Sequence, residues 1–328
     1  MLTINEEPNF DGDNFLQTPF WQQFKGKFGW QGKTFTAAYD NLNFSFLVLN
    51  RQIGRLFNFI YLPLPNFTPI TTNHSHFLKE LSKLLKKYYR NPLIIRYDLT
   101  WENNIILTNP LRKAIMPVQP PDTVIINLQQ SNEELLKNMH KKTRYNVGLA
   151  AKKGVTIRQD NNQIEQWYTM YQETAQRDGI AIHSYNYYQT FLQLAKENGL
   201  EARLYLAEHE GDLLAGIITL FYKDTATYVY GASSNLKRNL MASYGLQWQA
   251  MSDAKAFGCT AYDLFGIPPS DDPNHPMFGL YQFKTGFGGQ LVHRLGAYDY
   301  PVNWPLYTAF RLAEKGRLAK KELAKKRK

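Results

Sequence analysis

The chain has 328 residues, in which 38 Lys and Arg outnumber 28 Asp and Glu, so its formal net charge is +10. A hydrophobic content of 44% and a charged content of 20% are those of a globular protein and exclude a disordered or collagen-like chain. No apolar stretch is long enough to span a membrane, Cys259 is the only cysteine, and the N-terminal residues lack the apolar core of a signal peptide. We therefore expect a soluble, cytoplasmic protein of two domains.

The first 120 residues are predicted to form strands with one covering helix. Apolar residues at helical spacing predict a helix from His76 to Tyr89, which Asn91-Pro92 ends. Aromatic and β-branched runs indicate strands at 33–40, 44–49, 57–62 and 93–97. Three prolines between Pro117 and Pro121 make this segment the best candidate for a linker.

The remainder is predicted to alternate helices and strands. After a strand at 123–128, Ser131 and Glu134 form a capping box for a helix that runs to about Lys153, where Gly154 ends it. Further helices are expected at 164–178, 185–197 and 241–257, and strands at 203–208, 213–221, 225–232 and 260–265. This order resembles that of the GNAT acyltransferase fold, and a shortened version in the first half favours a duplicated fold.

The positive charge is concentrated in two segments. Residues 311–328 hold nine Lys or Arg and two Glu, and the stretch from Lys137 to Arg158 holds seven Lys or Arg and no acid. Such runs are either solvated helix surfaces or sites for a polyanion, such as RNA or an anionic membrane. In the second stretch the candidate polyanion-binding residues are Lys141, Lys142 and Arg144.

Several common kinds of catalytic site are disfavoured. No histidines have zinc-ligand spacing, Cys259 follows a helix-ending glycine as a buried residue would, and there is no Gly-x-Ser-x-Gly elbow. The segment Arg238–Ser243 stands where a CoA-dependent enzyme has its small-residue pyrophosphate loop, yet it contains Leu240 and Met241. We therefore expect no metal and an acyl donor other than CoA.

One lysine stands next to a group of glycines. Lys284 precedes Gly286, Gly288 and Gly289. Glycine-rich backbone beside a fixed cation suits close approach to a ligand. The alternative is a solvated lysine on a flexible hairpin.

Longer motifs occur along nearly the whole chain. They are Gln17-Thr18-Pro19 with Trp21, Gln119-Pro120-Pro121 with Thr123 and Leu128, Lys142-Thr143-Arg144-Tyr145-Asn146, Lys153-Gly154-Val155, Tyr262-Asp263 with Gly266, Asn274-His275-Pro276, Phe283-Lys284 with the glycines to Gly289, and Gly296-Ala297-Tyr298-Asp299. Taken together, these motifs resemble those of the FemABX family, the aminoacyl-tRNA-dependent transferases that build the interpeptide bridges of peptidoglycan.

The resemblance implies an α/β protein with mixed sheets and two tandem GNAT-like domains. The first domain is expected to comprise residues 1–120 and 296–328, whose last helix returns to it, and the second residues 121–295. Some relatives carry a long antiparallel helical arm in the second domain. Only about ten residues separate Ile157 from Trp167, so we expect no such arm here.

The reaction that the resemblance implies is attack by a stem-peptide amine on the ester between an amino acid and tRNA. The acceptor would be UDP-MurNAc-pentapeptide or lipid II, and no cofactor is implied because the ester already stores the activation. The basic tail could add a peripheral contact with the inner face of the plasma membrane. The sequence does not indicate the oligomeric state.

The resemblance also implies roles for individual residues. Lys284, with Phe283 before it, matches the family motif whose lysine is associated with transition-state charge. Asp98 falls where relatives carry a substrate-contacting carboxylate, which would orient the amine or accept its proton. The alternative for Asp98 is a cap at the end of a strand.

Five residues are expected to bind substrate, of which one is Phe283 and the other four would meet the acceptor. By placement, Lys25 would contact the diphosphate, and Tyr187 and Tyr230 would line the acceptor groove. His183 stands where some relatives have an arginine, and a neutral imidazole holds phosphate less firmly than a guanidinium.

Two other functions remain open on the sequence alone. The first is an acyl-CoA-dependent N-acyltransferase with the same fold. The second is a non-catalytic protein that binds RNA or a membrane surface through its basic tail.

Overall fold

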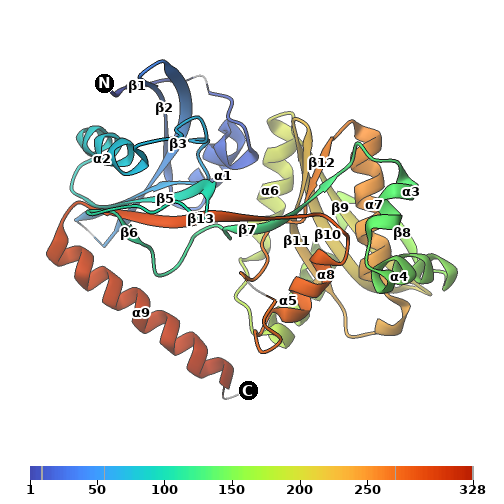
Figure 1. Ribbon diagram of the computed structural model, residues 1–328. Helices are drawn as coiled ribbons and strands as arrows, with labels where there is room; N and C mark the ends of the chain where they lie inside the picture. The colour runs from blue at the N-terminus through green and yellow to red at the C-terminus, as the bar shows by residue number, and fades with distance from the viewer. Residues whose placement is uncertain (9, 55, 270, 327–328) are drawn as a thin grey trace. The chain divides into compact units, whose positions relative to one another are not determined.

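A computed structural model describes residues 1–8, 10–54, 56–269 and 271–326, with the side chains of 321–326 excepted. The chain divides into two compact units, Met1–Pro121 with His293–Lys328, and Asp122–Val292. The basic segment predicted at 311–328 is therefore described with its side chains only as far as Lys320. Figure 1 shows the elements of each unit.

The first unit is built on a mixed sheet in the order β1-β2-β3-β4-β5-β13, with β6 paired to β13. Its strands are β1 Thr3–Glu6, β2 Gln31–Tyr39, β3 Leu42–Ile53, β4 Phe57–Leu62, β5 Pro92–Glu102, β6 Arg112–Lys113 and β13 Gln290–Pro301. The pairs are antiparallel except β4 with β5, which are parallel. This parallel pair needs a crossover, which α2 provides (Figure 1).

Helix α2, His74–Leu85, covers the sheet through Phe77, Leu78, Leu81 and Leu85, all fully buried. The predicted helix is confirmed, although it begins two residues earlier, after Asn73 at φ 53°, and its last part is a 3-10 turn, Lys86–Tyr88. The unit also contains a 3-10 turn, Phe15–Gln17, and α1, Pro19–Gly26, in which the Thr18 side chain caps the first turn.

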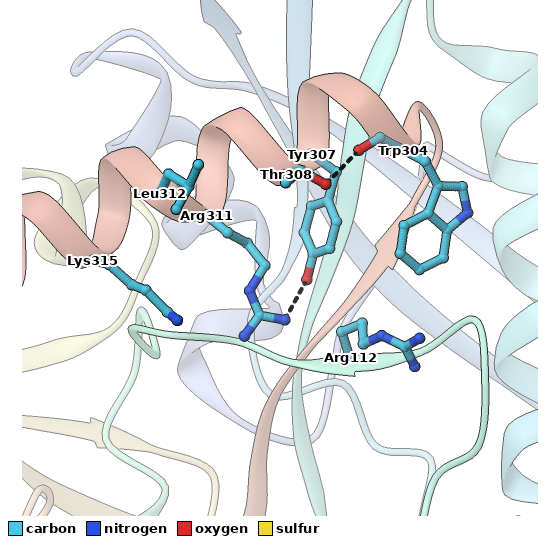
Figure 2. Close-up of a pocket in the computed structure, with 7 residues that line it drawn as sticks. All are labelled: Arg112, Trp304, Tyr307, Thr308, Arg311, Leu312 and Lys315. Carbon is cyan, nitrogen blue, oxygen red and sulfur yellow. Dashed lines mark hydrogen bonds between the residues drawn. The ribbon is translucent and has the colours of Figure 1, made fainter.

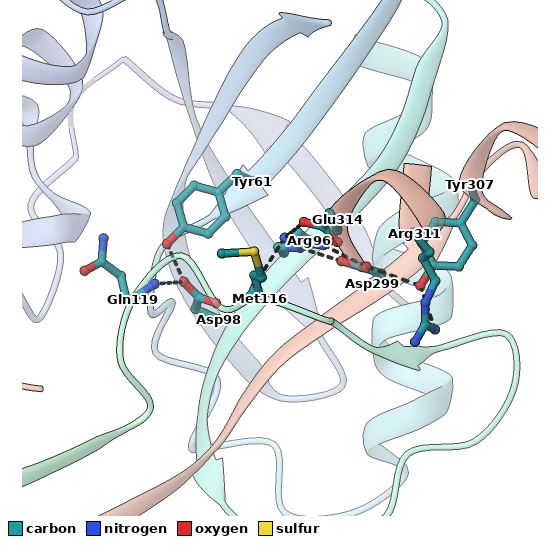
Figure 3. Close-up of polar contacts among 9 residues, drawn as sticks. All are labelled: Tyr61, Arg96, Asp98, Met116, Gln119, Asp299, Tyr307, Arg311 and Glu314. Atoms are coloured by element: carbon teal, nitrogen blue, oxygen red, sulfur yellow. Dashed lines mark hydrogen bonds and ion pairs between the residues drawn. The ribbon is translucent and has the colours of Figure 1, made fainter. Parts of the chain in front are cut away.

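The long C-terminal helix α9, Trp304–Lys326, is joined to the sheet by a buried ion-pair network (Figure 3). Arg96 of β5 donates to Asp299 of β13 at 2.7 and 3.0 Å and to Glu314 of α9 at 2.9 Å twice. All three side chains are buried. A guanidinium that meets two carboxylates with paired hydrogen bonds fixes the geometry of both partners, so the first half of α9 is held to β5.

The second unit has a sheet in the order β7-β12-β11-β10-β9-β8. Its strands are β7 Asp122–Asn127, β8 Thr156–Gln159, β9 Glu201–His209, β10 Asp212–Tyr222, β11 Thr225–Ser233 and β12 Ala261–Asp263. Only β11 and β12 are parallel. Between β9 and β10, Glu210 and Gly211 both have positive φ, as a two-residue hairpin of type I′ requires. Between β10 and β11 the register shifts at Ile218/Thr219, a bulge in β11.

Helices pack on both faces of this sheet. On one face α4, Lys141–Lys152, and α7, Ala242–Phe257, enclose a core with Tyr205 and Ile217. The other face receives α5, Ile164–Asp178, whose Trp167 donates its indole N–H to the carbonyl of Gly216 at 3.0 Å, and α6, Tyr185–Glu197. These two helices have 15 and 13 residues, so the part of the second unit that the structure describes has no long helical arm.

The single helix predicted from residue 131 to about 153 is wrong. The structure has α3, Asn132–Asn138, and then α4, because Met139 is extended and buried and the His140 N–H donates to the carbonyl of Gly286. The predicted capping box of Ser131 and Glu134 is confirmed, and Gly154 follows α4 at φ 77°.

The hairpin considered for residues around Lys284 is also wrong. A short helix, α8, Phe278–Thr285, precedes the glycines, and β13 follows them. None of the helices in the described residues is long and apolar enough to cross a membrane.

Candidate functional site

Asp98 lies in the middle of β5, because this strand continues to Glu102 and does not end at Tyr97. The strand-end cap considered from the sequence is therefore wrong. Its carboxylate accepts a hydrogen bond from the hydroxyl of Tyr61 on the parallel strand β4, and one of 2.9 Å from the backbone N–H of Gln119 (Figure 3). Both bonds go to Oδ2. Oδ1 is buried and has no hydrogen-bond partner among the described residues.

Burial changes the acidity of Asp98. The side chain is 1% exposed, and this desolvation raises its pKa from 3.8 to about 6, against the hydrogen bonds from Tyr61 and Gln119, which lower it. A carboxylate with a pKa near neutrality and a vacant lone pair has the properties of a proton acceptor. Burial also raises the pKa of Tyr61 well above its usual value, so Tyr61 remains a hydrogen-bond donor at neutral pH.

Lys25 belongs to the same side-chain cluster as Asp98. Its Nζ lies 5.4 Å from the ring centroid of Trp21 and 5.7 Å from that of Trp30, and the Trp30 ring contacts Tyr61 at 5.9 Å. Burial, with the charge of Arg51 second, lowers the pKa of Lys25 to about 8. The first unit therefore joins Lys25 to Asp98 through two aromatic rings.

Lys284 is at the C-terminal end of α8 and is 6% exposed. Its Nζ donates to the carbonyl of Phe265 at 2.7 Å and to that of Gly266 at 2.9 Å, which uses two of the three N–H groups of an ammonium. The ring of Tyr228 lies 4.9 Å from the same nitrogen. The solvated lysine considered from the sequence is wrong.

The electrostatics at Lys284 bring its protonation equilibrium close to neutral pH, so both the ammonium and the amine are populated there. Burial lowers its pKa from 10.5 to about 7, while the charge of Asp263 acts in the opposite direction. Asp263 itself accepts from the N–H of Phe265 at 2.7 Å and from the hydroxyl of Thr123. These bonds hold the chain at Phe265, whose φ of 52° turns two carbonyls toward the lysine.

The glycines after Lys284 serve packing in this structure. A Cβ on Gly286 would lie 2.3 Å from the Thr143 hydroxyl, and one on Gly288, at φ 81°, would lie 2.2 Å from the Asn138 carbonyl. The expectation that they leave room for a ligand is therefore wrong for these two positions, because α3 and α4 fill the space.

His183, Tyr187 and Tyr230 come together in the second unit. The exposed His183 ring stacks on Tyr187 with 3.8 Å between centroids, and Tyr187 meets Tyr230 edge-on at 6.4 Å. Burial raises the pKa of Tyr187 to about 12 and that of Tyr230 well above its usual value. Both hydroxyls are neutral donors at physiological pH.

Phe283 packs against the core of the second unit. Its ring lies 5.0 Å from that of Tyr244 and 5.3 Å from that of Phe287, and it is half-buried. These contacts fix the last turn of α8, which carries Lys284.

The basic residues of α4 are exposed at its N-terminal end. Lys141 and Lys142 lie in its first turn, which contains no acidic residue. Two cations at a helix N-terminus oppose the helix dipole, so their position does not stabilise the helix. Arg144 has a structural partner, since it donates to the carbonyls of Leu136 and Lys137 at 3.2 and 3.1 Å and thereby caps α3.

Sequence reasoning did not indicate a functional role for Tyr61 or Tyr228, and it included Gln119 only as part of a family motif. Tyr61 is one aromatic residue in the apolar strand β4. It meets Asp98 because β4 pairs in parallel with β5, which begins 30 residues after β4 ends. Tyr228 lies on β11 next to the bulge. The position of Tyr228 could be seen only in the structure, because a bulge between paired strands is not evident from the sequence.

No cofactor site is evident in the part of the chain that the structure describes. Within it, no three His, Cys, Asp or Glu lie close enough together to hold a metal ion. At the position of a CoA loop, Leu240 is buried in the core, and α7 begins after Met241 at φ 56°. With Leu240 and Met241 at these positions, there is no loop of small residues whose backbone could approach a pyrophosphate.

Solved structures with similar folds identify the architecture. A crystal structure of FemX superimposes with a TM-score of 0.76 at 19% identity, covering 92% of this chain and 96% of that chain. A tandem GNAT protein from the clavulanic acid biosynthesis pathway gives a TM-score of 0.53 at 9% identity, covering 92% and 99%. The protein therefore has an α/β fold of two tandem GNAT-like domains, as the sequence predicts.

Sequence comparison identifies the family. The FemAB family model matches residues 111–212 and 196–315, more than half of the chain. This chain belongs to the FemAB family.

Two relatives are lipid II:glycine glycyltransferases. That of Staphylococcus epidermidis (strain ATCC 35984) is 24% identical over 252 residues, and that of Staphylococcus aureus (strain USA300) is 25% identical over 257 residues. The matches cover 58% of this chain and 60% and 61% of the relatives, so this chain spans about 60% of their length.

Proposed function

We propose that this protein is an aminoacyltransferase that moves an amino acid from aminoacyl-tRNA to the side-chain amine of a peptidoglycan stem peptide. Membership of the FemAB family and the names of the glycyltransferase relatives support this reaction class. The acceptor is a muramyl-pentapeptide precursor, either UDP-MurNAc-pentapeptide or lipid II. We take its two domains to be residues 1–120 with 296–328 and residues 121–295, a division that the two compact units support.

The observation that carries the proposal is the environment of Lys284. Its ammonium is buried, and carbonyls of the described residues accept two of its three N–H groups. A positioned cation in a site of low dielectric stabilises a developing oxyanion more than a solvated one does. We assign Lys284 this role at the tetrahedral intermediate.

In the reaction the amine nitrogen bonds to the ester carbonyl carbon, and the bond from that carbon to the ribose oxygen of tRNA breaks. The amine gives up a proton, and the departing ribose oxygen takes one. Asp98 accepts the first proton, for which its pKa of about 6 and its vacant Oδ1 are suited. Because Asp98 is buried, its carboxylate must become accessible to the amine when substrate binds.

Most of the remaining residues bind the acceptor. Lys25, His183, Tyr187 and Tyr230 supply cationic and hydroxyl donors for the diphosphate and peptide of the acceptor. Phe283 supports Lys284 through its packing.

The tRNA backbone is bound by Lys141 and Lys142, the two lysines whose helix-terminal position has no structural benefit. Arg144, which is also exposed, lies two residues further along α4, and both of its bonds to α3 come from Nη1. The protein acts in the cytoplasm, at the inner face of the plasma membrane when the acceptor is lipid-linked.

The test is to incubate the protein with charged tRNA and each acceptor and to measure the mass of the stem peptide. The expected result is an increase by one or more aminoacyl residues, dependent on charged tRNA and lost after ribonuclease treatment. Absence of an adduct with every charged tRNA would overturn the proposal. Saturable heat on titration with acetyl-CoA would favour the CoA-dependent alternative, which the buried Leu240 opposes.

A further inference from the structure

A basic groove on α9 is not used by the proposed reaction. It has a volume of about 250 Å³ and is lined by Arg112, Trp304, Tyr307, Thr308, Arg311, Leu312 and Lys315. Figure 2 shows the α9 side chains and Arg112 around it. Spacings of three and four residues put all six α9 residues on one helix face.

The cations of this groove have no acidic partners. In the described part of the chain, Arg112, Arg311 and Lys315 make no ion pair, whereas Arg158 and Arg203 are each bonded to carboxylates. Arg311 donates to the Tyr307 hydroxyl at 3.4 Å. Among the α9 residues whose side chains are described, the acidic one is Glu314, which is buried against Arg96 and does not offset the charge of the groove.

Two large apolar side chains stand among these cations. Trp304 is 45% exposed, with the Arg112 guanidinium 5.3 Å from its ring centroid, and Leu312 is 64% exposed. A tryptophan and a leucine on a basic helix face are typical of helices that lie in a lipid interface. A nucleic-acid backbone would be neutralised by the cations but would gain little from Leu312.

We infer that this α9 face, Arg112 with Trp304, Arg311, Leu312 and Lys315, docks the protein on an anionic lipid membrane. The cations bind the phosphates of lipid headgroups, while Trp304 and Leu312 insert at the level of the acyl boundary. The inference rests on the proposed function, which places the protein at the membrane when the acceptor is lipid-linked, and it names the residues that would bind there. Binding to a membrane can be tested without substrate.

The experiment is cosedimentation of the full chain, without substrates, with vesicles of phosphatidylcholine alone or of equal parts phosphatidylcholine and phosphatidylglycerol. We expect binding only to the anionic vesicles, weakening as salt rises. The double variant Arg311→Gln/Lys315→Gln should bind on the order of twentyfold more weakly, since each cation near an anionic surface contributes about fivefold. Leu312→Ser should weaken binding with no change in charge.

A matched control removes the same charge from the same helix. Arg317 and Lys320 are exposed and fall outside the spacing of the docking face, so Arg317→Gln/Lys320→Gln should change binding by no more than a fewfold. If Arg311→Gln unfolds the helix, Lys315→Gln/Leu312→Ser replaces it, since both residues are exposed.

Three results would overturn the inference. The first is no binding of the protein to anionic vesicles, and the second is an equal loss of binding in the two charge-matched double variants. The third is an Arg311→Gln/Lys315→Gln variant that keeps its vesicle binding but loses binding to tRNA. Transfer to UDP-MurNAc-pentapeptide and to lipid II is measured separately on the same variants. Loss of docking with transfer to UDP-MurNAc-pentapeptide intact supports the inference, and docking without transfer to either acceptor would refute the proposed function alone.

Discussion

The hydroxyl of Tyr61 donates to the carboxylate of Asp98 across two parallel strands, and both groups are buried. Together with the Gln119 N–H, this bond occupies Oδ2 and leaves Oδ1 open. The arrangement fixes the carboxylate while keeping one lone pair for a proton. Its consequences can be measured at each of the residues involved.

Replacing Asp98 by Asn should abolish most turnover while the fold is kept. The amide can still accept a hydrogen bond from Gln119, but it cannot take a proton from the amine. We expect kcat to fall on the order of 10²–10⁴-fold, measured by mass spectrometry of the stem peptide. Wild-type turnover with an unchanged melting temperature would remove Asp98 from the mechanism.

Replacing Tyr61 by Phe should shift the pH dependence of the reaction. The Tyr61 hydrogen bond lowers the pKa of Asp98 against the effect of burial, so its loss should raise that pKa above about 6. The acid limb of the kcat/KM profile should move to higher pH. Tyr97→Phe is the matched control, since Tyr97 is a buried tyrosine bonded to Ser82. A limb that moves equally in both variants would contradict the assignment.

Lys284 should make the stability of the protein depend on pH. Its pKa is about 7 in the folded chain and close to 10.5 when unfolded. Between these values the unfolded chain binds more protons, so the free energy of unfolding should rise with pH from about 7 to 10. Lys284→Met should lack this rise, as measured by urea unfolding at several pH values. Parallel curves for the two proteins would show that the lysine is solvated.

The Arg96 network should be important for stability. Arg96→Ala leaves Asp299 and Glu314 as buried, unpaired charges, which costs about 3–5 kcal/mol. The control Arg158→Ala removes a partly exposed arginine paired with Asp160 and Glu208, which should cost about 0–1 kcal/mol. Urea midpoints measure both. Equal losses would mean that α9 is not held by this network.

Glycine substitutions at the two ends of α8 should have opposite effects. A Cβ on Gly286 meets the Thr143 hydroxyl and the Gln282 carbonyl, at 2.3 and 2.9 Å, while a Cβ on Gly279 meets nothing within 4 Å. Gly286→Ala should therefore destabilise by about 1–3 kcal/mol, and Gly279→Ala should be neutral or stabilise by up to about 1 kcal/mol. Thermal unfolding distinguishes the two, and a harmless Gly286→Ala would contradict the packing of α8 on α4.

Local patterns predicted most helices and strands because each has one clear periodicity. The α2 residues Phe77, Leu78, Leu81 and Leu85 are spaced as one helix face, and all are buried. The break between α3 and α4 could not be predicted from periodicity. It depends on Met139 packing into the core and on a bond from His140 to Gly286, a residue distant in the sequence.

Individual residues of the candidate site could be predicted from the sequence, but their arrangement in space could not. Motifs indicated Asp98 and Lys284, yet the polar Asp98 interrupts an apolar run, so the predicted strand ended five residues before β5 does. The partners of Lys284 are carbonyls of Phe265 and Gly266, whose direction depends on one backbone angle. No side-chain pattern encodes that geometry.

The central claim is direct transfer from tRNA to the stem peptide with Lys284 at the reacting carbonyl. The most direct measurement mixes an excess of the protein with tRNA charged with an isotopically labelled amino acid and with UDP-MurNAc-pentapeptide or lipid II. The labelled residue should appear on the stem-peptide amine with the wild-type protein, and on the order of 10²-fold more slowly with Lys284→Met. Label found only as free amino acid, or transferred equally fast by the variant, would contradict the account.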